Sequence, residues 1–202
     1  MKGIEKLASY FQKFPGIGPR QAKRFVYFLL TQEKGVLEEI ARLVKELKDK
    51  TVECNHCHRF FEADGYAEAC DICGSPNRDA HLLMIVEKDA DLEAIEKSGV
   101  YNGRYFVLGG TVSLLDGTPK TLRVEDLLSR VRDTNGGLTE IILATGAHPE
   151  GEMTADHVRT LLSHLLDKQK FTLTLLGRGL STGTELEYSD RETIRNALIN
   201  RR

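Results

Sequence analysis

The stretch "CNHCHRFFEADGYAEACDIC", from Cys54 to Cys73, divides the sequence, with a helical pattern before it and alternating strands and helices after it. It contains all four cysteines of the 202-residue chain, in two Cys-x-x-Cys pairs separated by twelve residues. Such pairs can place four thiolates tetrahedrally around one Zn²⁺, which leaves no open position for water or substrate. We therefore expect a structural zinc site, with His56 and His58 outside the coordination sphere, and with these ligands: Cys54, Cys57, Cys70 and Cys73.

The composition is that of a folded protein without a membrane segment. Hydrophobic residues make up 41% of the chain, which is enough to bury a substantial core. The longest apolar run, "FVYFLL" at residues 25–30, is too short to cross a membrane, and charges interrupt the amino-terminal sequence where a signal peptide would be apolar. We expect a cytoplasmic protein with no membrane partner, and in that reducing compartment clustered cysteines are metal ligands rather than disulfides.

Before the cysteine segment, apolar residues recur at helical spacing over residues 4–11, 22–29 and 37–47. Between the first two stretches lies "FPGIGPR" (residues 14–20), whose two glycines and two prolines cannot continue a helix. The pattern predicts three helices, the first two joined by a tight turn. An ordinary helical hairpin is the alternative to a functional one, so the turn needs a second observation beside it.

That second observation is charge. Residues 1–50 carry eleven Lys and Arg against six Asp and Glu, whereas the rest of the chain has a net charge of −7. A solvated charged face would explain charge alone, but here the charge lies beside a turn whose following helix presents amides to a phosphate. The motif resembles the helix-hairpin-helix that contacts DNA backbones without reading sequence. The expected DNA-binding residues are Gly16, Gly18, Arg20, Lys23 and Arg24.

After Cys73, short apolar runs alternate with helical patterns, which predicts a parallel α/β sheet with crossovers over roughly residues 80–176. The expected strands are residues 81–87, 105–110, 140–145 and 171–176, and the expected helices are residues 91–99, 124–132 and 154–168. A final helix is expected near the carboxyl end. No Gly-x-x-x-x-Gly-Lys-Ser/Thr loop is present, so P-loop nucleotide hydrolysis has no support.

Three acids follow two of the predicted strands. Glu87 closes the first strand, and Glu150 and Glu152 lie in an expected loop, "HPEGEM", after the third. Ligands of open parallel sheets bind beyond the carboxyl ends of the strands, where three carboxylates can hold Mg²⁺ for phosphoryl chemistry. Solvated loop acids explain the same spacing, and both interpretations stay open on the residues alone.

A series of motifs runs along the chain in this order: "PGIGPR", "CDIC", "NRD", "GRYFVLGG", "LDG", "ILAT", "EGE-TA" and "LEYSD". Through these motifs, nearly the whole chain resembles the bacterial RecR family of recombination mediators. The resemblance implies a Toprim fold for the α/β part. It also implies a protein that is not an enzyme, that forms ring-shaped dimers or tetramers around DNA, and that works with RecO and RecF to load a RecA-type recombinase onto single-stranded gaps. Mg²⁺ binding is possible under this reading but would not be catalytic.

Carried onto this sequence, the resemblance places Arg20 and Arg24 on the DNA-facing surface. It makes Glu87, Glu150 and Glu152 candidates for contacting RecO rather than for catalysis. The resemblance implies a helix-hairpin-helix domain at residues 1–52 and a zinc segment at residues 53–79 that holds the helices against the α/β domain. It also implies a Toprim domain at residues 80–176 and a carboxyl-terminal segment with oligomer contacts at residues 177–202. The chain departs from the family pattern at four positions: His148, Pro149, Thr184 and Glu185. These departures leave open whether the protein depends on RecO.

Two alternatives remain beside the mediator. The first is a Mg²⁺-dependent Toprim enzyme, nuclease-like or primase-like, that would use Glu87, Glu150 and Glu152. Against it, Toprim enzymes pair a Glu with Asp-x-Asp rather than Glu-x-Glu, and the chain has no room for the further domains of topoisomerases or primases. The second is a zinc-ribbon transcription factor, which leaves the α/β half of the chain unexplained. The sequence therefore predicts a DNA-binding recombination mediator.

Overall fold

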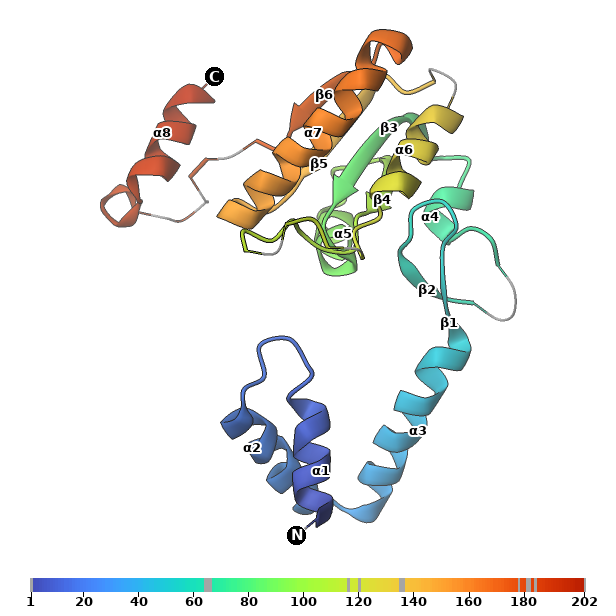
Figure 1. Ribbon diagram of the computed structural model, residues 1–202, viewed down its shortest axis with the longest axis vertical. Helices are drawn as coiled ribbons and strands as arrows, with labels where there is room; N and C mark the ends of the chain where they lie inside the picture. Colours follow the sequence, from blue (N-terminus) through green and yellow to red (C-terminus); the bar gives the residue numbers. More distant parts are fainter. Residues whose placement is uncertain are drawn as a thin grey trace. The chain divides into compact units, whose positions relative to one another are not determined.

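The computed structural model forms two compact units, Met1–Thr51 and Val52–Arg202. Figure 1 draws both units. Thr184 lies outside the described residues, and for residues 166–169 the backbone alone is described. The structure describes residues 2–63, 67–115, 117–119, 121–134, 137–177, 179–180, 183 and 185–201.

The first unit contains α1 (Lys2–Phe11), α2 (Pro19–Leu30) and α3 (Lys34–Lys50). Helices α1 and α2 pack against each other through a small core in which Ala8, Ala22 and Val26 are buried. The ring of Phe11 lies 5.8 Å from the rings of both Phe14 and Phe25, which joins the turn to the two helices. The predicted helical hairpin is therefore present.

Helix α3 has the predicted apolar face, but none of its residues is buried, and the structure describes all of them. Val44 and Leu47 keep more than 60% of their surface exposed, at 66% and 63%. Arg42 pairs with Glu39 and Glu46 along the opposite side, at spacings of three and four residues that place the charges next to each other on the helix. Within its own unit, α3 is thus a charged helix with an uncovered apolar stripe.

The second unit is built on a parallel four-stranded sheet in the order β4-β3-β5-β6. Its strands are β3 (Asp79–Val86), β4 (Gly103–Val107), β5 (Glu140–Ala144) and β6 (Thr172–Leu175). The crossover helices are α5 (Asp89–Ser98), α6 (Val124–Asp133) and α7 (Pro149–Gln169). This arrangement confirms the predicted parallel α/β fold.

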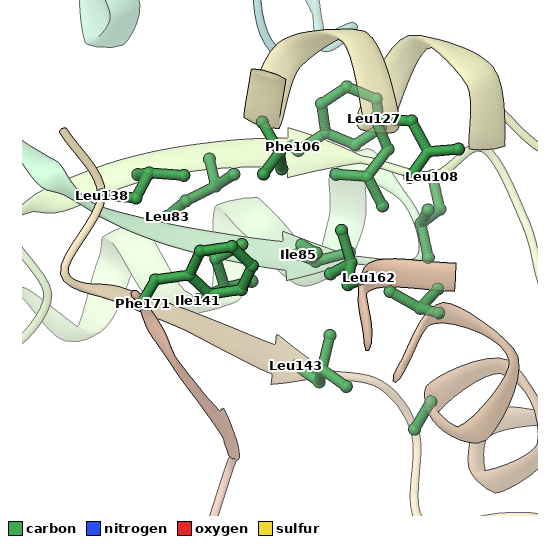
Figure 2. Close-up of a cluster of buried hydrophobic side chains, with 14 of the residues drawn as sticks. Leu83, Ile85, Phe106, Leu108, Leu127, Leu138, Ile141, Leu143, Leu162 and Phe171 are labelled. Atoms are coloured by element: carbon green, nitrogen blue, oxygen red, sulfur yellow. The ribbon is translucent and has the colours of Figure 1, made fainter. Parts of the chain in front are cut away.

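Helices α6 and α7 cover one face of this sheet. Alternate residues of β3 point to opposite sides, as a period of two requires. Leu83 and Ile85 join Phe106 of β4, Leu127 of α6 and Leu162 of α7 in the larger core cluster. Figure 2 shows these side chains meeting between the strands and the helices. Burying each such side chain stabilises the fold by about 1.5–3 kcal/mol, so this layer fixes the sheet.

The other face of the sheet is covered by α5 and by the cysteine segment. The segment consists of a two-stranded sheet, β1 (Thr51–Glu53) and β2 (Phe60–Glu62), and the short helix α4 (Asp71–Gly74). Its four buried cysteines belong to the same cluster as Met84 and Val86 of β3 and Leu92 of α5. The segment is therefore part of the core of the α/β unit.

The chain ends with a short 3₁₀ helix, η1 (Leu186–Tyr188), and the predicted final helix, α8 (Arg191–Ile199). Asp190 caps α8, because its carboxylate accepts hydrogen bonds from the backbone N–H groups of Glu192 and Thr193 at 2.9 Å. The hydrogen bonds from Thr193 lower the pKa of Asp190, which keeps the cap charged. Among the described residues, no helix is both long enough and apolar enough to cross a membrane.

Candidate functional site

The cysteine cluster has the geometry of a metal centre. The four sulfur atoms all lie within 4.8 Å of one another, and those of Cys57 and Cys70 are 3.6 Å apart. Four sulfurs around Zn²⁺, each about 2.3 Å from the metal, lie about 3.8 Å apart, so the donor set and its size fit a closed tetrahedral site. The predicted ligands are therefore brought together, and all four are buried.

Hydrogen bonds within the cluster favour the thiolate form at Cys54 and the thiol form at Cys57. Hydrogen bonds from the thiol of Cys57, and then from those of Cys70 and Cys73, place the pKa of Cys54 far below its ordinary value. The pKa of Cys57 is raised in turn, because its proton is held in the bond to Cys54. The backbone N–H of Cys70 also donates to the sulfur of Cys54 at 3.4 Å. Metal ions bind the thiolate form, and the case for a bound cation rests on the four sulfur atoms that the fold brings together.

The cluster is tied directly to the sheet. The backbone N–H of Val107, at the end of β4, donates to the carbonyl oxygen of Cys57 at 2.8 Å. On the other side, Asp89 at the start of α5 accepts from the backbone N–H of Phe60 at 2.8 Å. His58, which the sequence placed outside the coordination sphere, contacts Glu53 at 2.7 Å and lies edge-on to Phe106. A metal in this site would therefore stabilise one face of the sheet.

The turn between α1 and α2 leaves the start of α2 open. Gly16 has a positive φ of 75°, which favours glycine, and Pro19 occupies the first turn of α2. Gly18 is the N-cap, and no side chain caps the helix. The first amides of α2 therefore face solvent, where the positive end of the helix dipole favours an anion.

The three predicted cations beside this turn are all exposed: Arg20, Lys23 and Arg24. Of these, Arg24 contacts the side-chain oxygen of Gln21 at 3.5 Å, and none makes an ion pair within the described part of the chain. Unpaired cations around open helix amides form a surface that suits a polyanion. A methyl group at Gly18 would meet nothing within 4 Å, so this glycine leaves room next to the amides.

Glu87 lies at the carboxyl edge of the sheet, as predicted, but it is buried, with 5% of its surface exposed. One carboxylate oxygen accepts a hydrogen bond from the backbone N–H of Gly146 at 2.7 Å. The other lies 3.8 Å from Nε2 of His148. Strand β3 has β4 and β5 as its neighbours, so Glu87 stands where the strand order reverses, the position at which open sheets bind ligands.

Glu150 and Glu152 lie in the first turn of α7, not in a loop, which corrects the sequence prediction. The helix begins at Pro149, five residues earlier than expected, because Pro is preorganised for a first turn and His148 acts as a cap. Nδ1 of His148 accepts from the backbone N–H of Gly151 at 3.2 Å. Both acids complement the positive end of the helix. His148 and Pro149, at which the chain departs from the family pattern, thus form the start of α7.

The structure does not gather the three acids around one metal position. Among the described residues, the four cysteines form the only group of three or more ligand side chains close enough to hold one ion. His148 stands between two of the acids, with Nδ1 3.3 Å from the carboxylate of Glu150 and Nε2 facing Glu87. The carboxyl edge of the sheet is therefore an acidic surface that contains one histidine, His148.

Sequence reasoning missed two features of this edge. Thr154 is fully buried, and its hydroxyl donates to the carbonyl of Glu150 at 2.6 Å and accepts from the backbone N–H of Val112 at 2.8 Å. Gly109 and Gly110 both donate to the carbonyl oxygen of Glu87 at 2.9 Å. The "GG" within "YFVLGG" was the available signal, since paired glycines often mark close backbone approach.

Comparisons with known proteins agree with this architecture along the whole chain. Family models match in three places: "RecR, helix-hairpin-helix" at residues 4–49, "Toprim domain" at residues 81–176 and "RecR, C-terminal" at residues 179–202.

Curated relatives named "Recombination protein RecR" include those of Bacteroides fragilis and Rhizorhabdus wittichii, both 38% identical to this chain. Each alignment covers 98% of this chain, with 92% and 96% of the respective relatives. The chain therefore belongs to the RecR family of recombination proteins.

Proposed function

We propose that this chain, a protein of recombinational DNA repair, acts as a DNA clamp that helps to load a recombinase onto single-stranded gaps. As a member of the RecR family it is a recombination protein and not an enzyme. The observation that carries the proposal is the open amino end of α2 with its exposed cations. Each such contact to a phosphate is weak, but several in one oligomer add up to a firm grip that reads no bases.

DNA binding is tested by fluorescence anisotropy over a salt series, with single-stranded and duplex oligonucleotides. The variant Arg20→Ala/Arg24→Ala removes two exposed cations beside Gly18. If both contact phosphates, the slope of log affinity against log salt falls by about 1.4–1.8 per subunit engaged.

The matched control is Lys45→Ala/Lys48→Ala, which removes the same charge from exposed positions of α3. A clamp that grips DNA through the turn loses affinity only in the arginine variant. Equal losses in both variants would mean that net charge, not the turn, binds DNA.

The acidic edge, which is the carboxyl edge of the sheet with Glu87, Glu150 and Glu152, is proposed as the contact for RecO. The segment after residue 50 has a net charge of −7, which complements a basic partner and repels DNA phosphates. Glu150 is 41% exposed at its side chain, whereas Glu87 is 6% exposed and supports the surface from below. RecF and a RecA-type recombinase complete the proposed pathway. Any Mg²⁺ bound here would be non-catalytic.

We propose that the chain assembles into a dimer or tetramer ring in the cytoplasm. Support comes from α3, a 17-residue helix whose apolar side chains are left uncovered within its unit. Exposed apolar patches of this kind mark association surfaces. Val44→Asp/Leu47→Asp should lower the mass measured by light scattering. The carboxyl-terminal segment, residues 177–202, is a second proposed contact, and an unchanged mass in the α3 variant would leave assembly to that segment.

The cysteine cluster is proposed to hold Zn²⁺ in a structural role. The proposed functional divisions are residues 1–52 for DNA, 53–79 for the metal, 80–176 for the Toprim domain and 177–202 for assembly. Support for a structural role comes from the burial of all four cysteines and their packing against β3 and α5. Metal analysis of purified protein should give one zinc per chain, and protein that is folded and DNA-competent without metal would contradict this role.

A further inference from the structure

A pair of leucines stands uncovered beside the acidic edge. In the connection between β4 and α6, Leu114 is 54% exposed and Leu115 is 94% exposed. The residues that anchor the connection are buried, with Val112 at 5% and Leu122 at 7% exposure. We call Leu114 and Leu115 the leucine tip. The two apolar side chains project from a connection whose ends are fixed in the core.

Hydrogen bonds join Ser113 and Gly117, the described residues on either side of the leucine tip. The backbone N–H of Ser113 donates to the carbonyl of Gly117 at 2.9 Å, and the N–H of Gly117 donates back at 3.0 Å. The hydroxyl of Ser113 also accepts from the N–H of Leu115 at 3.2 Å. Gly117 has a positive φ of 73°, which a turn of this kind takes readily from glycine. A fixed turn lowers the entropy cost of binding through its tip.

The residues that precede the turn connect it to the acidic residues. Gly109 and Gly110, which begin the connection, donate to the carbonyl of Glu87. Val112 donates to Thr154, which in turn donates to the carbonyl of Glu150. Figure 1 shows the connection after β4 passing beside the start of α7. Hydrogen bonds therefore tie the connection that bears the leucine tip to the edge that bears the acids.

We propose that the leucine tip is the apolar anchor of the partner-binding surface whose charged part is formed by Glu150 and Glu152, with the buried Glu87 beneath them. This proposal rests on the partner role proposed above. The occupant is a basic protein with an apolar pocket bordered by Lys or Arg, because a few residues buried in a partner's pocket supply most of the binding energy while surrounding charges set orientation and rate. A nucleic acid does not fit, since its phosphates would meet the carboxylates.

The test uses surface-immobilised full-length protein and the RecO protein of the same genome as the probe. Leu114→Ser/Leu115→Ser should weaken binding by about tenfold or more, mainly through faster dissociation, because two anchors are lost. The matched control is Val100→Ser, an 87% exposed apolar residue between α5 and β4, at the opposite edge of the sheet. The control should change the affinity less than about twofold.

Salt dependence separates the two parts of the surface. The leucine variant should keep the wild-type salt dependence, whereas Glu150→Gln should reduce it, because only the glutamine variant removes a charge. Both leucines are exposed, so the variant should keep the wild-type thermal midpoint. Light scattering and DNA anisotropy on the same variant test whether a second copy of the chain or DNA occupies the tip instead.

Wild-type affinity in the leucine variant, with weakened binding in Glu150→Gln, would overturn this inference and leave the partner site in place. Wild-type affinity in both variants would overturn the inference together with the proposed partner site. A changed oligomer mass or changed DNA affinity, with RecO binding intact, would also overturn it, because the occupant would then be another molecule.

Discussion

Replacing Thr154 with Val tests whether one buried hydroxyl holds the acidic edge together. Val has nearly the same shape as Thr but lacks the hydroxyl, so the change removes two hydrogen bonds without opening a cavity. The backbone N–H of Val112, which now donates to Thr154, would be left buried without an acceptor. The carbonyl of Glu150 would lose its bond from the side chain.

The expected loss of stability is about 2 kcal/mol, because a buried donor without a partner costs about 1–3 kcal/mol. Most of this loss falls on the Val112 amide itself. A change of 2 kcal/mol in local opening corresponds to roughly thirtyfold faster exchange of that amide with solvent deuterium. Hydrogen exchange measured by mass spectrometry on peptides that contain Val112 would report it directly.

Thr160→Val is the matched control on the same helix. The hydroxyl of Thr160 makes the same type of bond, to the carbonyl of Asp156 at 2.8 Å, but it is exposed to water. Water replaces a lost exposed bond, so this variant should exchange and unfold like the wild type. If Val112 exchanges at the same rate in Thr154→Val as in the control, the hydroxyl does not tether the connection to α7.

Three further outcomes are expected. Replacing Cys73 by Ser should lower the metal content measured by atomic spectroscopy and deprotect β4 in hydrogen exchange, and full protection without metal would contradict a structural site. Gly151→Ala places a methyl group 2.2 Å from loop backbone and should lower the free energy of unfolding by about 2 kcal/mol or more, whereas Gly35→Ala, which meets nothing within 4 Å, should not destabilise the protein. The hydrogen bonds from Arg78 lower the pKa of Glu96, so the stability that this pair adds is present above the pKa of Glu96 in the unfolded chain and is lost as the pH falls through its pKa in the folded protein. The free energies of unfolding of Glu96→Gln and wild type, measured by urea titration, should therefore converge at low pH. A difference between them that does not change with pH would contradict the assignment.

Much of the fold was predictable because its signals are local. The unbroken apolar run of "HLLMIVE" reflects a strand that is buried on both faces, and the four parallel strands were found close to their predicted positions. The glycine-rich turn and the paired cysteines were equally readable, since each needs only a few neighbouring residues. Family membership then followed from the order of these pieces.

The parts that the sequence did not predict depend on contacts between distant residues. The start of α7 was misplaced because the cap is the ring of His148, a residue type with weak capping preference. The burial of Glu87 depends on Gly146, which lies 59 positions along the chain. The tie between Val112 and Thr154 spans 42 positions. Periodicity carries no information about such pairs.

The packing of the cysteine cluster against β3 and α5 has a consequence for how the protein is made. A chain is synthesised from its amino end, so residues 54–73 leave the ribosome before the strands that they will cover. A metal bound by the four cysteines at that stage would supply the cover before the sheet forms. In a cell short of the metal, the sheet would form with its Met84 and Val86 face bare, a surface that invites aggregation. Metal supply would then determine the yield of folded protein, at a stage before the protein can bind DNA.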